Sequence, residues 1–200
     1  MRMRMGRRRG RRRRLGPAKS VLTAVAVVPP EDVWAPIQAI RQRYDRRFAR
    51  WMPHITMIFP FVPRPQLEDA VRKLEGACEG VAPFDVTLGE FRYFEHPTGS
   101  ATVWLAPEPA EPLKALHGRL LTVFPQYDDQ LRPAGEFVPH LSVGQARSWD
   151  EAAELAEQFQ GGWRPLTFRV EHVSVLVRGP ESPFKEYARV RLRGGRSAVD

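Results

Sequence analysis

The stretch MPHITMIF at residues 52–59 has a counterpart of the same design, VPHLSVGQ, at residues 138–145. Both run proline, histidine, apolar residue, hydroxyl residue, as Pro53-His54-Ile55-Thr56 and Pro139-His140-Leu141-Ser142. Residues two apart in a β-strand point to the same face, so the histidine and the hydroxyl of each stretch point together. The apolar residue between them points to the opposite face. This alternation is typical of a sheet that lines a solvent-filled groove.

Other stretches repeat in the same order around these two. VAVVPPE at 25–31 matches VWLAPEP at 103–109, and PFDVTLGEFRYF at 83–94 matches PLTFRVEHVSVL at 165–176. Each half therefore follows the order strand, helix, strand, helix, strand, strand, which indicates an internal duplication. The duplication predicts an α+β fold of two pseudo-symmetric lobes, each an antiparallel sheet with outer helices. We expect the active-site groove between the lobes.

Hydrophobic periodicity places the elements within each half. Apolar runs and period-two alternation predict strands at residues 21–28, 52–59, 84–94, 102–106, 137–144, 166–177 and 187–192. Apolar spacings of three and four predict helices at residues 31–48, 65–74, 113–124 and 149–159. Changes in the phase of alternation predict bulges near Gly89-Glu90 and at Glu171-His172. The lobes are expected at roughly 20–100 and 101–193, with exchange of strands between them allowed.

The charge is unevenly distributed along the chain. The 200 residues carry a net charge of +8, yet residues 1–16 alone hold nine arginines and no acid. Without them, 22 basic residues face 23 acidic ones, a net charge of −1. We expect residues 1–19 to form a disordered arginine-rich arm ahead of a bilobal domain at 20–200. The arm either contacts nucleic acid nonspecifically through phosphates or is a nonessential extension.

Targeting and redox signals are weak. The arginines followed by VLTAVAVV resemble a secretion signal, but this apolar run has eight residues and forms a strand that the duplication requires. No apolar run approaches the roughly 20 residues that cross a bilayer. The single cysteine, Cys78, excludes an intrachain disulfide. We therefore expect a cytoplasmic, monomeric protein that does not contact membranes.

Two histidine and hydroxyl pairs suit transfer chemistry at phosphorus. One neutral imidazole can take a proton while a second, protonated imidazole gives one. Hydroxyls donate hydrogen bonds to the nonbridging phosphate oxygens. In-line transfer places the base and the acid on opposite sides of the phosphate, and a pseudo-twofold axis provides that placement. Such a site requires no metal, and the absence of a glycine-rich phosphate loop predicts no nucleotide cofactor.

On these two motifs, in a duplicated α+β chain, the sequence resembles the two-histidine (2H) phosphoesterases. Within them it is most similar to the bacterial 2′-5′ RNA ligase and RNA cyclic phosphodiesterase group, over roughly residues 20–193. The resemblance implies that His54 and His140 are catalytic and that Thr56 and Ser142 bind phosphate. It also implies opening of 2′,3′-cyclic phosphates to 2′-phosphates without metal or cofactor, and in some members 2′-5′ joining of RNA ends.

One departure from the family pattern bears on the substrate. Gly144-Gln145 follows the second motif, where relatives often carry a basic residue, which leaves the nearby phosphate contacts open. The alternatives are an RNA end, a small cyclic nucleotide or ADP-ribose cyclic phosphate, and RNA binding without turnover through the arginine-rich arm. Further candidates for substrate contact are Arg132, Arg147, Phe59, Phe137 and Tyr127. Core packing of the aromatic residues and solvation of the arginines are the competing interpretations.

The remaining histidines do not form a metal-binding pattern. His96 is expected at the surface in a turn, and His117 in a structural position, exposed or half-buried, on an amphipathic helix. His172 lies at the second expected bulge, which can turn a side chain into a site. No His-x-x-x-His or Cys-His cluster is present in the sequence, so no zinc site is expected.

Overall fold

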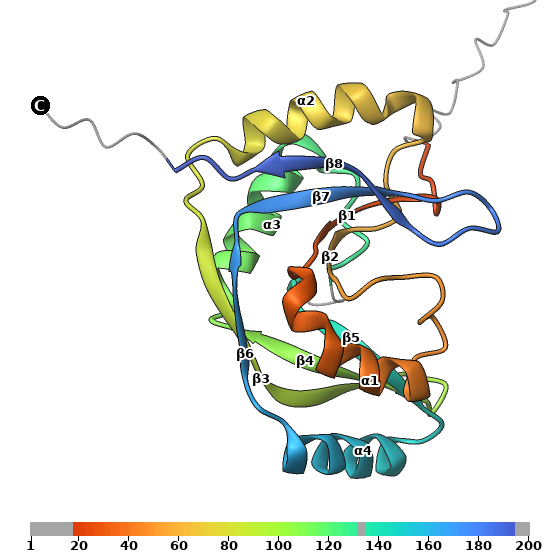
Figure 1. The fold of residues 1–200 in the computed structure, drawn as a ribbon. Helices are drawn as coiled ribbons and strands as arrows, with labels where there is room; N and C mark the ends of the chain where they lie inside the picture. The colour runs from red at the N-terminus through yellow and green to blue at the C-terminus, as the bar shows by residue number, and fades with distance from the viewer. Residues whose placement is uncertain (1–17, 132–134, 195–200) are drawn as a thin grey trace, which may run out of the picture.

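The structure is a computed structural model that describes residues 18–131 and 135–194 (Figure 1). The arginine-rich arm up to residue 17 and the candidate contact Arg132 lie outside the described residues. The strands are β1 (Thr23–Val27), β2 (Ile55–Ile58), β3 (Phe84–Glu95), β4 (Ala101–Glu108), β5 (Leu141–Ala146), β6 (Leu166–Val170), β7 (His172–Val177) and β8 (Lys185–Arg191). The α-helices are α1 (Trp34–Tyr44), α2 (Leu67–Cys78), α3 (Glu111–Val123) and α4 (Trp149–Gly162), with 3-10 turns at Glu31–Val33 and Arg64–Gln66.

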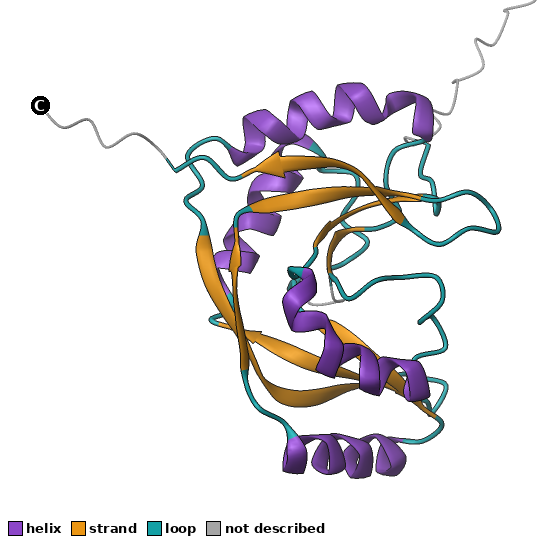
Figure 2. Cartoon of the chain, viewed as in Figure 1, coloured by secondary structure: helices purple, strands orange, loops and turns teal. Residues whose placement is uncertain are grey.

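Two four-stranded antiparallel sheets form the two lobes (Figure 2). The first sheet has the order β2-β1-β7-β8, and the second has the order β5-β4-β3-β6. The predicted α+β class and its two lobes are therefore confirmed. The strands that carry the motifs, β2 and β5, each lie at an edge of their sheet.

The two halves of the sequence exchange strands. Strand β7, from the second half, pairs with β1, while β3, from the first half, pairs with β4. The boundary expected near residue 100 therefore does not separate the lobes. The reason is the short turn between β3 and β4, because strands joined by a short turn pair with each other in one sheet. The last strand of the first half, β3, and the last two strands of the second half, β7 and β8, are thus built into the sheet of the other half.

Of the two predicted bulges, one is present and one is not. The register of β3 against β4 shifts between Leu88 and Glu90, as the sequence predicted. The second change of phase, at Glu171, marks the end of β6 in one sheet and the start of β7 in the other. Moving to another sheet reverses which face of the strand is buried, and this produces the same sequence signal as a bulge.

The helices cover the sheets and close the sides of the molecule. Helices α2 and α3 pack against each other, and α2 also packs on β8. Helix α4 covers β3 and β4, while α1 lies along the edge strand β5 (Figure 1). In the part of the chain described here, no helix combines the length and the apolar character needed to cross a bilayer.

Helix α1 is shorter than the sequence predicted, ending at Tyr44 rather than near Phe48. Asp45 leaves the helical conformation, with φ −99° and ψ 106°. Its carboxylate accepts a hydrogen bond of 2.8 Å from the backbone N–H of Arg47, which is an Asx-type turn. Residues 45–51, named the arginine loop below, therefore leave the helix and lead to β2.

Candidate active site

The two motif histidines occupy equivalent positions in the two lobes. His54 directly precedes β2 and His140 directly precedes β5. Both strands lie at sheet edges and contact each other across the interface between the lobes. The duplicated motifs are thus brought together in space, although 86 positions separate the two histidines in the sequence.

Each histidine ring is held by its own backbone. The Nδ1 atom of His54 lies 2.8 Å from the carbonyl oxygen of Met52, and Nδ1 of His140 lies 2.8 Å from that of Val138. A carbonyl oxygen only accepts hydrogen bonds, so Nδ1 carries the proton in both neutral rings. Nε2 is then the nitrogen with which each ring exchanges protons with a substrate.

The alternation predicted for the two motif strands is confirmed. Ile55 and Met57 are fully buried in the first lobe, and Leu141 and Val143 are fully buried in the second. The histidines and hydroxyl residues on the other face are half-buried. The buried residues fix the register of each strand, and this register points both hydroxyls toward the interface between the lobes.

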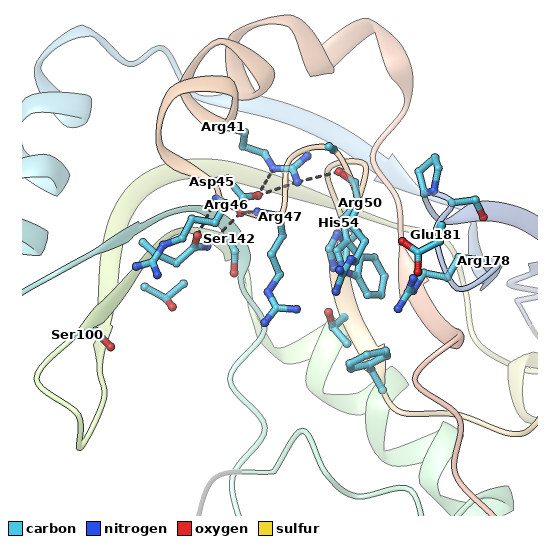
Figure 3. Close-up of a pocket in the computed structure, with 18 of the residues that line it drawn as sticks. Arg41, Asp45, Arg46, Arg47, Arg50, His54, Ser100, Ser142, Arg178 and Glu181 are labelled. Carbon is cyan, nitrogen blue, oxygen red and sulfur yellow. Dashed lines mark hydrogen bonds and ion pairs between the residues drawn. The ribbon is translucent and has the colours of Figure 1, made fainter.

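A pocket of about 920 Å³ lies between the lobes (Figure 3). His54 and Thr56 line it from the first lobe, and Ser142 lines it from the second. His140 lies close enough that its charge lowers the pKa of His54. Three of the four predicted motif residues therefore line one pocket. The fourth, His140, interacts electrostatically with His54.

His54 lies in an aromatic environment. The ring of Trp51 stacks on it, with centroids 4.4 Å apart and planes 16° from parallel. The Trp51 ring also stacks on the ring of Phe184, with centroids 3.7 Å apart. Burial lowers the pKa of His54 to about 4, and the positive charge of Arg41 adds to this effect. His54 is therefore neutral at pH 7.

His140 is also flanked by aromatic rings, but by their edges. Phe94 meets it at 4.9 Å between centroids and 88° between planes, and Trp104 meets it at 5.9 Å. Each motif histidine thus contacts one tryptophan, face to face in the first lobe and edge to face in the second. Because of this difference, the two imidazoles are not chemically equivalent.

The wall of the pocket carries a group of arginines that the motifs did not predict. They are Arg41, Arg46, Arg47 and Arg50 from α1 and the arginine loop, and Arg178 from the segment after β7. The sequence contained a signal for four of them, since RQRYDRRFARW at residues 41–51 directly precedes the first motif. Five arginines against two acids, Asp45 and Glu181, leave a surplus of three positive charges in the pocket wall. An anion is therefore the favoured ligand.

A buried ion pair organises the start of the arginine loop. The guanidinium of Arg41 contacts the Asp45 carboxylate at 2.8 Å, and both side chains are almost fully buried. Arg41 also donates to the carbonyl oxygens of Gln38 (side chain) and Trp51 (backbone), each at 2.8 Å. This network joins the end of α1 to the residue that stacks on His54, so Arg41 supports the position of the histidine rather than remaining available for a ligand.

The residues after the second motif explain the departure seen in the sequence. Gly144 lies against α1, where an added Cβ would approach the Tyr44 side chain to 2.8 Å. The Gln145 amide accepts from the backbone N–H of Arg46 at 2.9 Å and donates to the Asp45 carboxylate at 3.1 Å. Glycine and glutamine at these positions therefore attach the arginine loop to the second lobe.

The other predicted contacts divide between the pocket and the core. Phe59 lines the pocket. Arg147 is an exposed partner of Glu151 and does not line the pocket. Phe137 and Tyr127 are 6% and 2% exposed, so they are core residues and not substrate contacts as predicted. The competing interpretation, core packing, is correct for these two aromatic rings, because Phe137 stacks on His117 and Tyr127 packs against Phe61 and Phe124.

The three remaining histidines differ in their surroundings. His96, predicted as a surface residue, is half-buried, lines the pocket and contacts the Thr102 hydroxyl at 2.9 Å. His117 is 2% exposed and stacks on Phe137. His117 is therefore more buried than predicted, because α3 packs this face inward. His172 begins β7 and does not line the pocket. Within residues 18–131 and 135–194, no three His, Cys, Asp or Glu side chains converge as a metal site would require.

Comparison with known proteins agrees with this geometry. A sequence profile described as the 2′-5′ RNA ligase superfamily matches residues 29–181. A protein of Oceanobacillus iheyensis, provisionally named a phosphoesterase, is 28% identical over 138 residues, covering 68% of this chain and 77% of the relative. Another provisionally named phosphoesterase, from Bacillus cereus, is 30% identical over 135 residues, covering 66% and 73%.

Solved structures share the fold. LigT of E. coli, solved with NADP+, has a TM-score of 0.58 at 18% identity, with 88% of this chain and 99% of LigT covered. TT0787 of Thermus thermophilus has a TM-score of 0.56 at 20% identity, covering 86% and 98%. The profile match extends over most of the chain, including both histidine motifs. The chain therefore belongs to the 2′-5′ RNA ligase superfamily of two-histidine phosphoesterases.

Proposed function

We propose that the protein is a metal-independent phosphoesterase that opens 2′,3′-cyclic phosphates at RNA ends to 2′-phosphates. One observation carries the proposal. The duplicated motifs place His54, Thr56 and Ser142 around one positively charged pocket, with His140 within electrostatic range of His54. A pair of imidazoles and a pair of hydroxyls from opposite lobes are the groups that in-line transfer at phosphorus uses.

The relatives support the reaction class. Those from Oceanobacillus iheyensis and Bacillus cereus are provisionally named phosphoesterases. E. coli LigT has been solved with phosphate and with 3′-AMP, so a protein of this fold accommodates a nucleotide and its phosphate. The family description adds 2′-5′ joining of RNA as a related activity.

The proposed hydrolysis proceeds in one displacement. The hydroxyls of Thr56 and Ser142 hold the nonbridging oxygens of the cyclic phosphate and stabilise the charge that develops on them. One imidazole takes a proton from water as the water oxygen attacks phosphorus. The bond from phosphorus to the 3′ oxygen breaks, and the second imidazole protonates that oxygen. The product carries a 2′-phosphate and a free 3′-hydroxyl.

The environment of His54 supports one assignment of the two roles. Its pKa of about 4 leaves the ring neutral at pH 7 and able to accept a proton. We therefore assign His54 as the general base toward water and His140 as the general acid toward the 3′ oxygen. The backbone bond at Nδ1 directs proton exchange to Nε2 in both rings. After turnover the base has gained a proton and the acid has lost one, and exchange with solvent restores both.

Ligation through a 2′-5′ bond follows from the same site. An RNA 5′-hydroxyl would take the place of water, and the cyclic phosphate would supply the energy for the new ester bond. No separate nucleotide cofactor is needed, which agrees with the absence of a glycine-rich phosphate loop in the sequence. In the reverse direction, cleavage of a 2′-5′ linkage, the histidines exchange roles.

Mass analysis of the products from RNA ended by a 2′,3′-cyclic phosphate tests the proposal directly. The wild-type protein should add one water and give a 2′-phosphate, whereas His54→Ala and His140→Ala should lose about 10²-fold or more in rate. EDTA should leave the rate unchanged, and strong inhibition would indicate a metal enzyme. Folded double variants with wild-type rates would refute the proposal.

A substrate panel separates the alternatives. Cyclic mononucleotides and ADP-ribose cyclic phosphate, tested beside the oligonucleotide, show whether a small molecule is preferred. Binding of RNA without product from any cyclic phosphate would instead favour a protein that binds RNA without turnover. Binding through the arginine-rich arm alone should fall steeply with added salt.

A further inference from the structure

We propose that Arg46, Arg47 and Arg50 form a second anion subsite, which takes a phosphate group adjacent to the reacting one, and that Gln145 positions it. The inference rests on the proposed function, because the reacting phosphate is assumed to lie between the two motifs. It begins from Gln145, the uncharged residue that lies on β5 shortly after the second motif. In this protein, the cations come from the opposite side of the pocket.

Gln145 holds the arginine loop at its start. Its side-chain carbonyl accepts from the backbone N–H of Arg46 at 2.9 Å, and its NH₂ group donates to the Asp45 carboxylate at 3.1 Å. The same carboxylate accepts from the backbone N–H of Arg47 at 2.8 Å. Because Gln145 lies on β5, three residues beyond Ser142, the loop is fixed to the lobe that supplies the second phosphate-binding hydroxyl.

The loop is also held at its end. The backbone carbonyl of Arg50 accepts from the N–H of Phe184 at 2.9 Å, and that of Trp51 accepts from the Arg41 guanidinium at 2.8 Å. Trp51 in turn stacks on His54. The backbone that carries the three arginines is therefore fixed relative to both motifs, which a preorganised binding site requires.

The three guanidinium groups are available for a ligand. Among the residues that the structure describes, none of them forms an ion pair with a carboxylate. All three side chains line the pocket and are exposed to solvent. Arg41 differs, because its charge is balanced by Asp45 within the buried network. The exposed arginines therefore carry the positive charge that a ligand meets.

Their arrangement extends the site beyond the reacting phosphate. In Figure 3, Arg47 lies beside the space between His54 and Ser142, and Arg46 and Arg50 lie to either side of Arg47. A 2′,3′-cyclic phosphate carries one negative charge, and the two hydroxyls already provide donors for its oxygens. Three additional guanidinium groups match a second phosphate, since arginine binds phosphate through paired donors. The substrate class is therefore a nucleotide with an adjacent phosphate, as in an RNA chain, rather than an isolated cyclic mononucleotide.

Calorimetric binding of two product analogues tests the subsite without requiring turnover. Adenosine 2′-monophosphate and adenosine 2′,5′-bisphosphate differ by one phosphate group. The wild-type protein should bind the bisphosphate about tenfold more tightly at fixed ionic strength, a difference typical of a charged hydrogen-bonded contact. The double variant, Arg46→Gln combined with Arg50→Gln, should lose most of the preference for the bisphosphate. Arg43→Gln is the matched control, since Arg43 is exposed on α1 but does not line the pocket.

A third variant tests the positioning role of Gln145. Gln145→Met retains the size of the side chain and all the arginines but removes both hydrogen bonds. It should weaken the preference for the bisphosphate while leaving the affinity for the monophosphate unchanged, which a general loss of stability would not do. Loss of affinity for both nucleotides in parallel would show that Gln145 is only structural.

The outcomes for the subsite and for the proposed function are separable. Equal affinity of the wild-type protein for the two nucleotides, no measurable binding of either, or a preference that survives in the double arginine variant would overturn the subsite. If cyclic phosphates are hydrolysed under any of these outcomes, the proposed function stands alone. If nothing is hydrolysed but the preference follows the arginines, the subsite stands and the proposed reaction fails.

Discussion

The rings of His54 and His140 make the same contact in the two lobes: each Nδ1 lies 2.8 Å from the carbonyl oxygen of the residue two positions earlier. The contact is local, so it arises from the motif itself wherever a strand begins directly after the histidine. It fixes the tautomer of each ring and contributes to its orientation. The surroundings of the two rings then differ, and the proposed assignment of base and acid rests on this difference.

The hydroxyls of the motifs should act on the transition state. Thr56→Val and Ser142→Ala each remove one donor to the phosphate while keeping the strand buried on its other face. We expect kcat/KM for a cyclic phosphate to fall about 10²-fold in each variant, as when one preorganised donor is lost. Thr167→Val, at an exposed position on β6 outside the pocket, is the control and should retain full activity. Wild-type rates in both motif variants would exclude phosphate binding by these hydroxyls.

The acid side of the pH profile should report His54. Its pKa of about 4 means that the base remains neutral well below pH 6.5. We expect no loss of kcat/KM as the pH falls from 7 toward 5, and a decrease only near pH 4. Trp51→Leu should open the ring to water and move this decrease toward pH 6.5. A wild-type profile that already halves near pH 6.5 would contradict the assignment of His54 as the base.

Gly144 should tolerate no side chain. In Gly144→Ala, the new Cβ would lie 2.8 Å from Cβ of Tyr44 and 3.3 Å from its carbonyl oxygen. Because part of this contact is backbone, α1 would have to shift, and we expect a loss of about 1–3 kcal/mol in unfolding free energy. The matched variant Gly118→Ala, inside α3 with no atom within 4 Å, should instead gain about 0.5–1 kcal/mol. Chemical denaturation measures the unfolding free energy of both variants. Equal changes in the two variants would contradict the prediction.

His117 should make the fold sensitive to acid. Burial lowers its pKa from 6.5 to about 4, and its Nε2 has no hydrogen-bond partner in the described structure. Between pH 6.5 and 4, the unfolded chain binds a proton that the folded protein does not, so stability falls as the pH falls through this window. This difference between the folded and unfolded pKa corresponds to about 3 kcal/mol at pH 4.

The variant His117→Phe retains a ring against Phe137 and removes the titrating group. Its unfolding free energy should depend less on pH than that of the wild type, by about 3 kcal/mol between pH 7 and pH 4. Phe137→Leu, which leaves His117 in place, should be less stable but keep the slope of the wild type. Parallel pH dependences for wild type and His117→Phe would show that His117 does not titrate in this range.

Much of the fold follows from local pattern. The alternation of Ile55 and Met57 with His54 and Thr56 marks a strand with one buried face, and repetition of this pattern identifies the duplication. The order of strands and helices can be predicted in the same way, because apolar residues recur with a period of two residues in a strand and 3.6 residues in a helix. These periods reflect the geometry of each element alone. The apolar spacing predicts too late an end for α1, because Phe48 continues that spacing, whereas the hydrogen bonds of Asp45 set the turn.

Contacts between residues far apart in the sequence determine the features that local patterns do not predict correctly. The phase change at Glu171 predicts a bulge, but it marks a passage between sheets, since both reverse the buried face of a strand. Phe137 and Tyr127 lie near the second motif in the sequence, which predicts substrate contacts, but packing directs both rings into the core. Proximity along the chain does not determine which side chains a fold brings together.

The sequence by itself determined the duplicated motifs, the chemistry of their side chains and the face of the strand on which each one lies. Only the tertiary structure decided that strands β3, β7 and β8 are exchanged, that His54 stacks on Trp51, and that the arginine loop meets Gln145 across the pocket. The physical reason is the separation in sequence between the residues that interact. Strand periodicity and the histidine contacts arise between neighbouring residues, whereas burial, pKa and charge in the pocket depend on segments about 100 positions apart that meet only in the folded protein.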